Sequence, residues 1–234
     1  MSIRHMSLND LEMVLEWAAA EGWNPGLEDA TAFFAADPEG FFLKEVGGTP
    51  VAAISVVNHD ERFAFLGLYI CRPDHRGAGH GMEVWRAGLS HAGPRCIGLD
   101  GVPDQQANYA RSGFRRHGRT VRLSGSVARG AKLTSPPDLT QLSRADAQAT
   151  GIERSRFMGQ WFRETATRKT RAVIGTDGGP AFATYRKCRD GIKVGPFHAH
   201  SLTEAEALLA GVPSELGDGP LIVDVPDSSE VLQD

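Results

Sequence analysis

One stretch in the first half of the chain constrains the fold more than any other. An apolar, strand-like run covers 63–71, and Pro73 cannot continue it because proline has no N–H to donate to a neighbouring strand. Gly77, Gly79 and Gly81 follow, directly before an amphipathic helical pattern. The N–H groups at a helix start favour an anion, and glycine has no Cβ to keep a ligand away. The stretch therefore predicts a phosphate-binding turn.

Two other nucleotide-binding loops contain similar glycines but differ in spacing. A P-loop requires a lysine followed by serine or threonine, and this turn contains no lysine. The dinucleotide fingerprint GxGxxG would begin at Gly77 and would place its acidic partner near Asp100, but its third glycine would fall at Met82. After the strand expected at 96–100, the chain also lacks the long alternation of strands and helices that a doubly wound sheet requires.

The turn matches the R/Q-x-x-G-x-G/A loop of the GNAT acyltransferases, and a second motif strengthens the resemblance. The loop is Arg76-Gly77-Ala78-Gly79-His80-Gly81, and 108–114, Asn-Tyr-Ala-Arg-Ser-Gly-Phe, is similar to the family's helix ending in Tyr-x-x-x-Gly-Phe. The resemblance covers residues 1–125 and implies a domain that uses acetyl-CoA. It assigns the binding of this cosubstrate to Tyr69, Ile70, Cys71, Arg76, Gly77, Ala78, Gly79, His80, Gly81, Met82 and Asn108.

The same resemblance assigns the chemistry to Tyr109. The matching tyrosine of the family gives its proton to the leaving thiolate, and a phenol with a pKa of about 10 can protonate a thiolate whose conjugate acid has a pKa of about 8.5. An acceptor amine is mostly protonated at neutral pH, so a general base or a water relay is needed. Asp100 and the turn at 59–61 are the candidates for this base. Asn108 departs from the family pattern, whose asparagine lies several residues earlier, where this chain has Val102.

The pattern of apolar residues before the turn predicts a sheet flanked by helices. The periodicities and turn residues indicate the following elements: a strand at 2–6, a helix around 11–18, a short helix that ends before Pro38, and antiparallel strands at 41–46, 50–58 and 63–71. A helix at 79–91, a strand at 96–100, a helix at 105–112 and a strand beginning at Phe114 are expected to follow.

The second half repeats this order of elements. Few large apolar residues and several helix breakers occur at 126–138, which we interpret as a linker between an N-terminal domain at 1–125 and a C-terminal domain at 139–234. In the latter we expect a helix containing Phe157 and Trp161, strands at 171–174, 181–187, 192–194 and 221–225, and a helix at 205–210. This half resembles the C-terminal domain of two-domain bacterial GNAT acetyltransferases. A proline-containing segment, 195–200, replaces the glycine loop, so we expect no CoA there. The predicted fold is α+β, a tandem GNAT fold with mostly antiparallel mixed sheets and flanking helices.

Charge and cysteine content exclude several other classes of protein. The net charge of −4 provides no basic field for nucleic acid or for an anionic membrane surface. The three cysteines, Cys71, Cys96 and Cys188, are far apart, which fits a reducing cytoplasm better than a disulfide framework. His198 and His200 have no nearby third ligand, so no metal site is expected. Without an apolar run of about 18 residues, we expect no membrane span.

These observations predict a cytoplasmic acetyl-CoA-dependent N-acetyltransferase, a monomer or homodimer, that acts on a small primary amine by direct transfer. Tyr109 would be the general acid, and the acceptor pocket would be shaped by Trp23 and Asn24 together with Trp161 and Phe197. An aromatic residue beside a turn is more often part of a hydrophobic core. The alternative function is a sensor or structural module that binds acyl-CoA without turnover, which the degenerate second half suggests and Tyr109 opposes.

Overall fold

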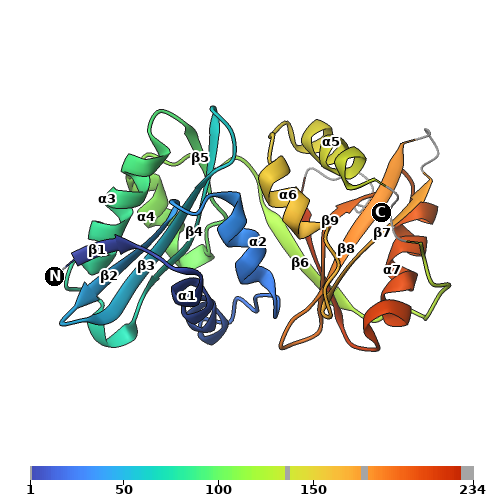
Figure 1. Cartoon of the computed structure of the whole chain (residues 1–234), viewed down its shortest axis with the longest axis horizontal. Helices are drawn as coiled ribbons and strands as arrows, with labels where there is room; N and C mark the ends of the chain where they lie inside the picture. The colour runs from blue at the N-terminus through green and yellow to red at the C-terminus, as the bar shows by residue number, and fades with distance from the viewer. Residues whose placement is uncertain (1, 135–137, 175–178, 228–234) are drawn as a thin grey trace. The chain divides into compact units, whose positions relative to one another are not determined.

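A computed structural model of the chain describes residues 2–134, 138–174 and 179–227. The chain forms two compact units, Met1–Gly98 with Pro137–Arg168, and Leu99–Pro136 with Lys169–Asp234. Among the described residues each unit contains a five-stranded mixed sheet, in the orders β1-β2-β3-β4-β5 and β6-β10-β9-β8-β7. Helices pack on both sheets, which confirms the predicted α+β class (Figure 1).

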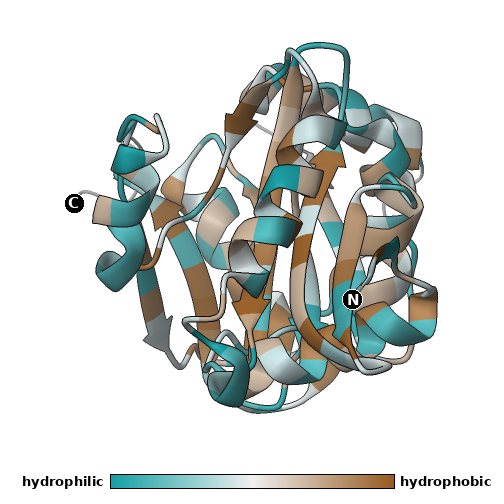
Figure 2. Cartoon of the chain, turned by 90° about the vertical axis from the view of Figure 1, so that its left-hand side faces the viewer, coloured by the Kyte–Doolittle hydropathy of each residue, from teal (hydrophilic) through white to brown (hydrophobic). Residues whose placement is uncertain are grey.

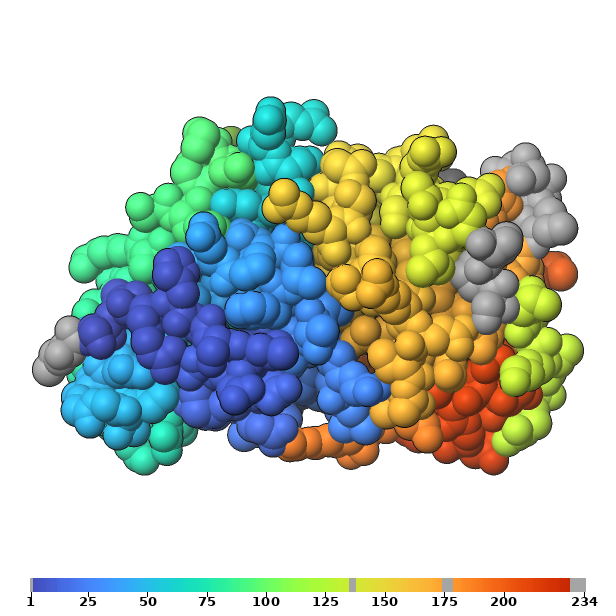
Figure 3. Space-filling view, viewed as in Figure 1, coloured from blue at the N-terminus to red at the C-terminus, as the bar shows by residue number. Residues whose placement is uncertain are grey.

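The first sheet follows the expected elements closely. Its described strands are β1 (Ser2–His5), β2 (Phe41–Val46), β3 (Thr49–Asn58), β4 (Phe63–Cys71) and β5 (Cys96–Gly98). The β4–β5 pair is parallel, and the pairs β1–β2, β2–β3 and β3–β4 are antiparallel. The helices are α1 (Leu8–Ala20), α2 (Asp29–Ala36) and α3 (His80–Ala92). Atoms of α1 and α2 are among the blue atoms of Figure 3, which belong to the N-terminal part of the chain.

The two faces of this sheet are covered by different helices. Leu11 and Val14 of α1 pack with Leu43 and other residues of one face. On the other face α3 packs closely on β3. A Cβ on Gly88 of α3 would lie only 2.6 Å from the Val56 side chain, so this close packing requires glycine at position 88. Apolar residues concentrate on the strands in Figure 2. A central strand such as β3 is buried on both faces, so its sequence does not alternate between apolar and polar residues.

Two helices from the second half of the sequence belong to the first unit. These are α5 (Leu139–Thr150) and α6 (Ser155–Trp161), which an ion pair between Arg154 and the buried Asp146 connects at 2.7 Å. The Trp161 ring stacks on Phe33 of α2 with 5.5 Å between the centroids. Stacked aromatic rings of this kind bury large areas, which explains why this segment packs on α2.

The second sheet is built from β6 (Thr120–Gly125), β7 (Arg168–Ile174), β8 (Pro180–Lys187), β9 (Ile192–His198) and β10 (Leu221–Pro226). The helices of this unit are α4 (Gln106–Arg111) and α7 (Leu202–Leu216). Short 3-10 turns occur at Pro73–His75 in the first unit and at Pro103–Gln105 in the second. Tyr185 is fully buried in this core, where its hydroxyl donates to the Leu208 carbonyl at 2.6 Å.

Several element boundaries differ from the expected ones. No strand begins at Phe114, and β6 starts at Thr120 and pairs with β10. The expected strand at 96–100 ends at Gly98, where its parallel pairing with β4 stops. The expected strand at 192–194 is longer in the structure, where β9 continues to His198 because Phe197 and His198 pair with β8.

The last helix is also longer than expected. It continues past Ala210 to Leu216, although it contains Gly211 and Pro213. Leu208, Val212 and Leu216 recur at intervals of four residues and are buried in the core. Their burial outweighs the poor helix propensity of glycine and proline. The compact units also divide the chain differently from the sequence halves, because β6 pairs with β10 and α6 packs on α2.

Candidate functional site

The pairing of β4 changes along its length. The parallel register with β5 ends at Phe65 and Gly98, whereas β4 continues to Cys71. Its register with β3 shifts near Leu68, which has φ +47°, an uncommon value for a residue with a side chain. The end of β4 therefore extends past its neighbour β5, and an extended ligand could add there as a further strand.

The turn after β4 has the geometry expected of an anion site. Gly77 and Gly79 have φ +80° and +85°, and a Cβ built on either would have no heavy atom within 4 Å. Gly79 is the N-cap of α3, so the open space borders the first N–H groups of the helix. The Arg76 guanidinium donates to the Cys71 carbonyl at 2.9 Å and to Glu21 at 2.5 Å. These two bonds hold a cation at the edge of the turn.

Two predicted binding residues at the end of β4 have side chains in structural roles. The Tyr69 hydroxyl would lie 2.8 Å from a Cβ on Gly81, and its ring is 5.2 Å from that of Trp85. Gly81 is thus required for a close approach of Tyr69 to α3. The Cys71 thiol donates to the His75 carbonyl at 3.4 Å, and burial raises the pKa of this thiol. Their backbone groups remain the predicted ligand contacts at these two positions.

The other predicted loop residues divide into exposed and buried ones. Ala78 and Met82 are exposed, whereas Ile70 and His80 are buried. The Nδ1 atom of His80 lies 3.6 Å from a carboxylate oxygen of Glu83.

The other oxygen of this carboxylate pairs with a residue that sequence reasoning missed. The ammonium of the buried Lys44 lies 2.5 Å from it. The sequence hinted at this ion pair in one way: Lys44 follows three apolar residues at the start of β2, where a buried strand would normally continue with an apolar residue.

Tyr109 is half-buried in α4. Its ring packs over Gly101, where a Cβ would lie 3.0 Å from the ring, and it meets the Phe114 ring edge-on at 6.1 Å between centroids. Burial raises the pKa of the Tyr109 phenol, so the hydroxyl keeps its proton at neutral pH. A protonated phenol is the form that a general acid requires.

Asn108 and Asp100 have different surroundings. The Asn108 amide donates to Gln105, the residue before α4, at 2.6 Å and accepts a hydrogen bond from Arg111 of α4, so both ends of the amide are engaged locally. Asp100 is exposed and follows β5, where desolvation by nearby protein atoms and the negative charge of Asp224 raise its pKa. A raised pKa brings a carboxylate closer to the range of a general base.

The second candidate base, the turn at 59–61, lies at the other end of β4. The strand that separates it from the glycine turn spans roughly 25 Å at a rise of about 3.3 Å per residue. Burial and the positive charge of Arg154 lower the pKa of His59 to about 4. Asp60 accepts hydrogen bonds from the backbone N–H groups of Arg62 and Phe63, both at 2.7 Å. These bonds are typical of a carboxylate that stabilises a turn.

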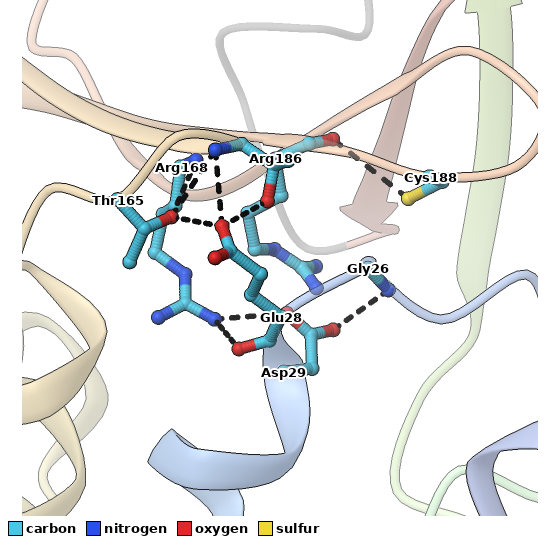
Figure 4. A network of polar contacts seen from close by, with 8 residues as sticks. Gly26, Glu28, Asp29, Thr165, Arg168, Arg186 and Cys188 are labelled. Carbon is cyan, nitrogen blue, oxygen red and sulfur yellow. Dashed lines mark hydrogen bonds and ion pairs between the residues drawn. The ribbon is translucent and has the colours of Figure 1, made fainter. Parts of the chain in front are cut away.

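The predicted acceptor contacts Trp23 and Asn24 follow α1. Both are half-buried, and Asn24 has φ +49°. The segment that comes next is fixed by Glu28, whose carboxylate accepts a hydrogen bond from the Thr165 hydroxyl (Figure 4). The same carboxylate accepts one from the Thr167 hydroxyl. This anchor belongs to the first unit and restricts the chain directly after Trp23 and Asn24.

Asp29 continues the same network. It accepts from the Gly26 N–H at 2.8 Å and from the buried Arg168 guanidinium at 3.1 Å (Figure 4). Arg168 also lies over the Trp161 ring, 4.6 Å from its centroid. Trp161 is only 4% exposed, and its predicted role at the acceptor pocket stays a prediction.

Phe197 lies in β9 of the second unit. Its side chain packs against the core and lines a cavity of about 210 Å³ together with Leu123, Ser124, Gly125, Ser126, Val127, Leu209, Leu221, Val223 and Val225. Among the described residues no cluster of three or more His, Cys, Asp or Glu side chains could hold a metal ion. In the same part of the chain, no helix has the length and apolarity to cross a membrane.

Comparisons with known proteins identify the family. The model for the acetyltransferase (GNAT) family matches residues 8–114, and that for an acetyltransferase (GNAT) domain matches 142–234. A holothin acyltransferase from Pseudoalteromonas sp. (strain SANK 73390) is 32% identical over 227 residues, which are 94% of this chain and 77% of that protein. The chain belongs to the GNAT family of acetyltransferases. This GNAT protein is therefore an acyltransferase with two GNAT regions in tandem, and acyl-CoA is the acyl donor of the family.

Solved structures show the same fold. A candidate acetyltransferase from Pyrococcus horikoshii has a TM-score of 0.75 at 22% identity, over 97% of this chain and 80% of that one. A GCN5-related N-acetyltransferase from Kribbella flavida has a TM-score of 0.54 at 19% identity, over 98% of this chain and 65% of that one. The predicted tandem GNAT fold is thus confirmed for this GNAT protein.

Proposed function

We propose that this protein transfers an acetyl group from acetyl-CoA to a primary amine of a small molecule. The observation that carries this proposal is the turn between β4 and α3, where two glycines with positive φ border open space at a helix N-terminus. Backbone N–H groups at such a position bind phosphate, and the Arg76 guanidinium, which is paired with Glu21, lies at the edge of the turn as a further hydrogen-bond donor.

The turn fits the phosphates of acyl-CoA, which supplies the acyl group as an activated thioester. The open spaces beside Gly77 and Gly79 would be filled by a Cβ on any other residue. Gly77, Ala78, Gly79 and Gly81 would hold the pyrophosphate through backbone groups, with Arg76 beside them. The backbone of 69–71 would hold the pantetheine arm, because this part of β4 extends past β5.

The proposed chemistry uses Tyr109 and Asp100. The Tyr109 hydroxyl would donate its proton to the departing thiolate, and its raised pKa supports the protonated state before the reaction. Asp100 would accept a proton from the acceptor ammonium, directly or through water, and its raised pKa supports this role. Asn108 would contribute less to binding, since its amide already bonds to Gln105 and Arg111.

The acceptor would bind near Trp23 and Asn24. The bonds of Glu28 to Thr165 and Thr167 support this proposal, because they anchor the segment directly after Trp23 and Asn24. Trp161 would act by shaping the surroundings of α2 rather than by touching the acceptor. The relative that is 32% identical is named for acyl transfer to one compound, holothin, which favours a small-molecule acceptor here.

We propose that the C-terminal region, 139–234, carries no CoA site. Its β9–β10 pair is parallel, as β4–β5 is, but only residues 199–201 separate β9 from α7. None of these three residues is glycine. Among the described residues 199–201, no positive-φ glycine precedes α7, which supports the proposal.

The test is release of free thiol from acetyl-CoA in the presence of a panel of amines. We expect thiol release that depends on one class of amine and exceeds the rate with acetyl-CoA alone. Thermal stabilisation by CoA without release for any amine would instead favour a non-catalytic acyl-CoA sensor.

A further inference from the structure

Lys44 is a buried cation next to the helix that follows the glycine turn. Its residue exposure is 2%, and it lies in the part of β2 that is otherwise apolar and buried. Its ammonium contacts one oxygen of Glu83 at 2.5 Å, and Glu83 is in the first turn of α3, where its N–H donates to the Gly79 carbonyl at 3.2 Å. The hydrogen bond from Lys44 lowers the pKa of Glu83, which is therefore ionised at neutral pH.

Stability alone does not explain this pair. Burying an ammonium in an apolar strand has a desolvation cost that one ion pair rarely exceeds, and apolar residues of similar volume are often as stable in such positions. Glu83 is also partly exposed, with 38% of its side chain accessible, which weakens the attraction further. The position of Glu83 gives a different explanation.

A carboxylate in the first turn of a helix competes with an external anion for the same N–H groups. In α3 the Glu83 carboxylate is held through one of its oxygens. Lys44 binds Oε2, and the ring nitrogen Nδ1 of the buried His80 lies 3.6 Å from Oε1. This arrangement neutralises the carboxylate and keeps it from turning back onto the start of the helix.

We propose that Lys44 is a positioning residue for phosphate recognition, which anchors Glu83 so that the N-terminus of α3 remains available to the pyrophosphate of acyl-CoA. This inference rests on the proposed function. Lys44 acts through Glu83 and does not itself touch the ligand.

The test compares ligands with and without phosphates. For Lys44→Met, calorimetry should show a Kd for CoA about tenfold higher, the effect of one uncompensated charge about 10 Å from a phosphate at an effective dielectric constant of about 20. The KM for S-acetylpantetheine, which has no phosphate, should stay within twofold of the parent value. The double variant Lys44→Met/Glu83→Gln should restore CoA binding to within about threefold of the parent. Glu83→Gln alone should leave the Kd for CoA equal or lower.

Arg4→Met is the matched control, because Arg4 pairs with Asp10 and Glu45 and with no residue of α3. Its Kd for CoA should equal that of the parent. Unchanged CoA binding in Lys44→Met, an equal loss with S-acetylpantetheine, or no restoration in the double variant would overturn the inference. If Lys44→Met does not fold, Glu83→Gln alone carries the test, and a higher Kd for CoA in that variant would overturn the inference. A parent protein that binds no CoA would refute the proposed function, and this inference with it.

Discussion

Replacement of Gly79 by valine tests the assignment of the phosphate turn. Gly79 has φ +85°, a conformation that costs residues with a side chain roughly 1–2 kcal/mol. No heavy atom lies within 4 Å of a Cβ built there, so backbone strain is the main expected cost to the free energy of unfolding. For a protein of this size, that cost corresponds to a fall in Tm of about 2–8 °C. The variant should therefore fold.

CoA binding should respond much more strongly than stability. The new side chain fills the space that the pyrophosphate needs, and each hydrogen bond to a charged group contributes about 1.5–3 kcal/mol. Loss of two such bonds raises the Kd by at least about 100-fold, which calorimetry would report as no detectable binding.

Gly151→Val is the matched control for this experiment. Gly151 has φ +69° at the C-terminal end of α5, and a Cβ there also has no heavy atom within 4 Å. This variant should lose a similar amount of stability in a thermal melt while its Kd for CoA stays unchanged. A folded Gly79→Val protein that binds CoA as tightly as the parent would refute the assignment, as would an equal loss of binding in Gly151→Val.

Three further predictions address the acid, the second region and the pH dependence of stability. Tyr109→Phe should lower kcat by about 10²–10⁴-fold with little change in the Kd for acetyl-CoA, and a kcat within threefold of the parent would exclude the acid role. Calorimetry of the whole chain should give one CoA per chain, and two sites would contradict the proposal for residues 139–234. His59 has a pKa of about 4 in the folded protein and an ordinary value of 6.5 in the unfolded chain. Between these pH values the unfolded chain binds a proton at His59 and the folded protein does not, so the free energy of unfolding should fall as pH drops from about 6.5 to 4. In His59→Gln, Tm should decrease less than in the parent over that interval; parallel curves would show that His59 has no such effect.

The sequence predicted best the turn between β4 and α3, which depends on residues that are neighbours in the chain. The bounds of β4 match the predicted strand, and α3 begins directly after Gly79, as its glycines and amphipathic pattern indicate. Proline and glycine act on the few residues around them, so this turn could be derived without knowledge of the rest of the fold.

Pairing between distant segments could not be derived in this way. The pairing of β6 with β10 joins residues about a hundred positions apart, and nothing in Thr120–Gly125 itself selects that partner. The docking of α6 on α2 depends on Phe33 and Trp161, whose contact no local pattern indicates. Lys44 was missed for the same reason, because its importance appears only when α3 brings Glu83 to it.

The most direct test of acyl transfer at this turn is mass spectrometry of a small-amine panel incubated with acetyl-CoA and the protein. We predict that at least one primary amine gains a single acetyl group in amounts that match the thiol released, and that Gly79→Val abolishes this product while Gly151→Val retains it. Absence of any acetylated amine with a folded, CoA-binding parent protein, or equal product formation by Gly79→Val, would contradict acyl transfer at the turn between β4 and α3.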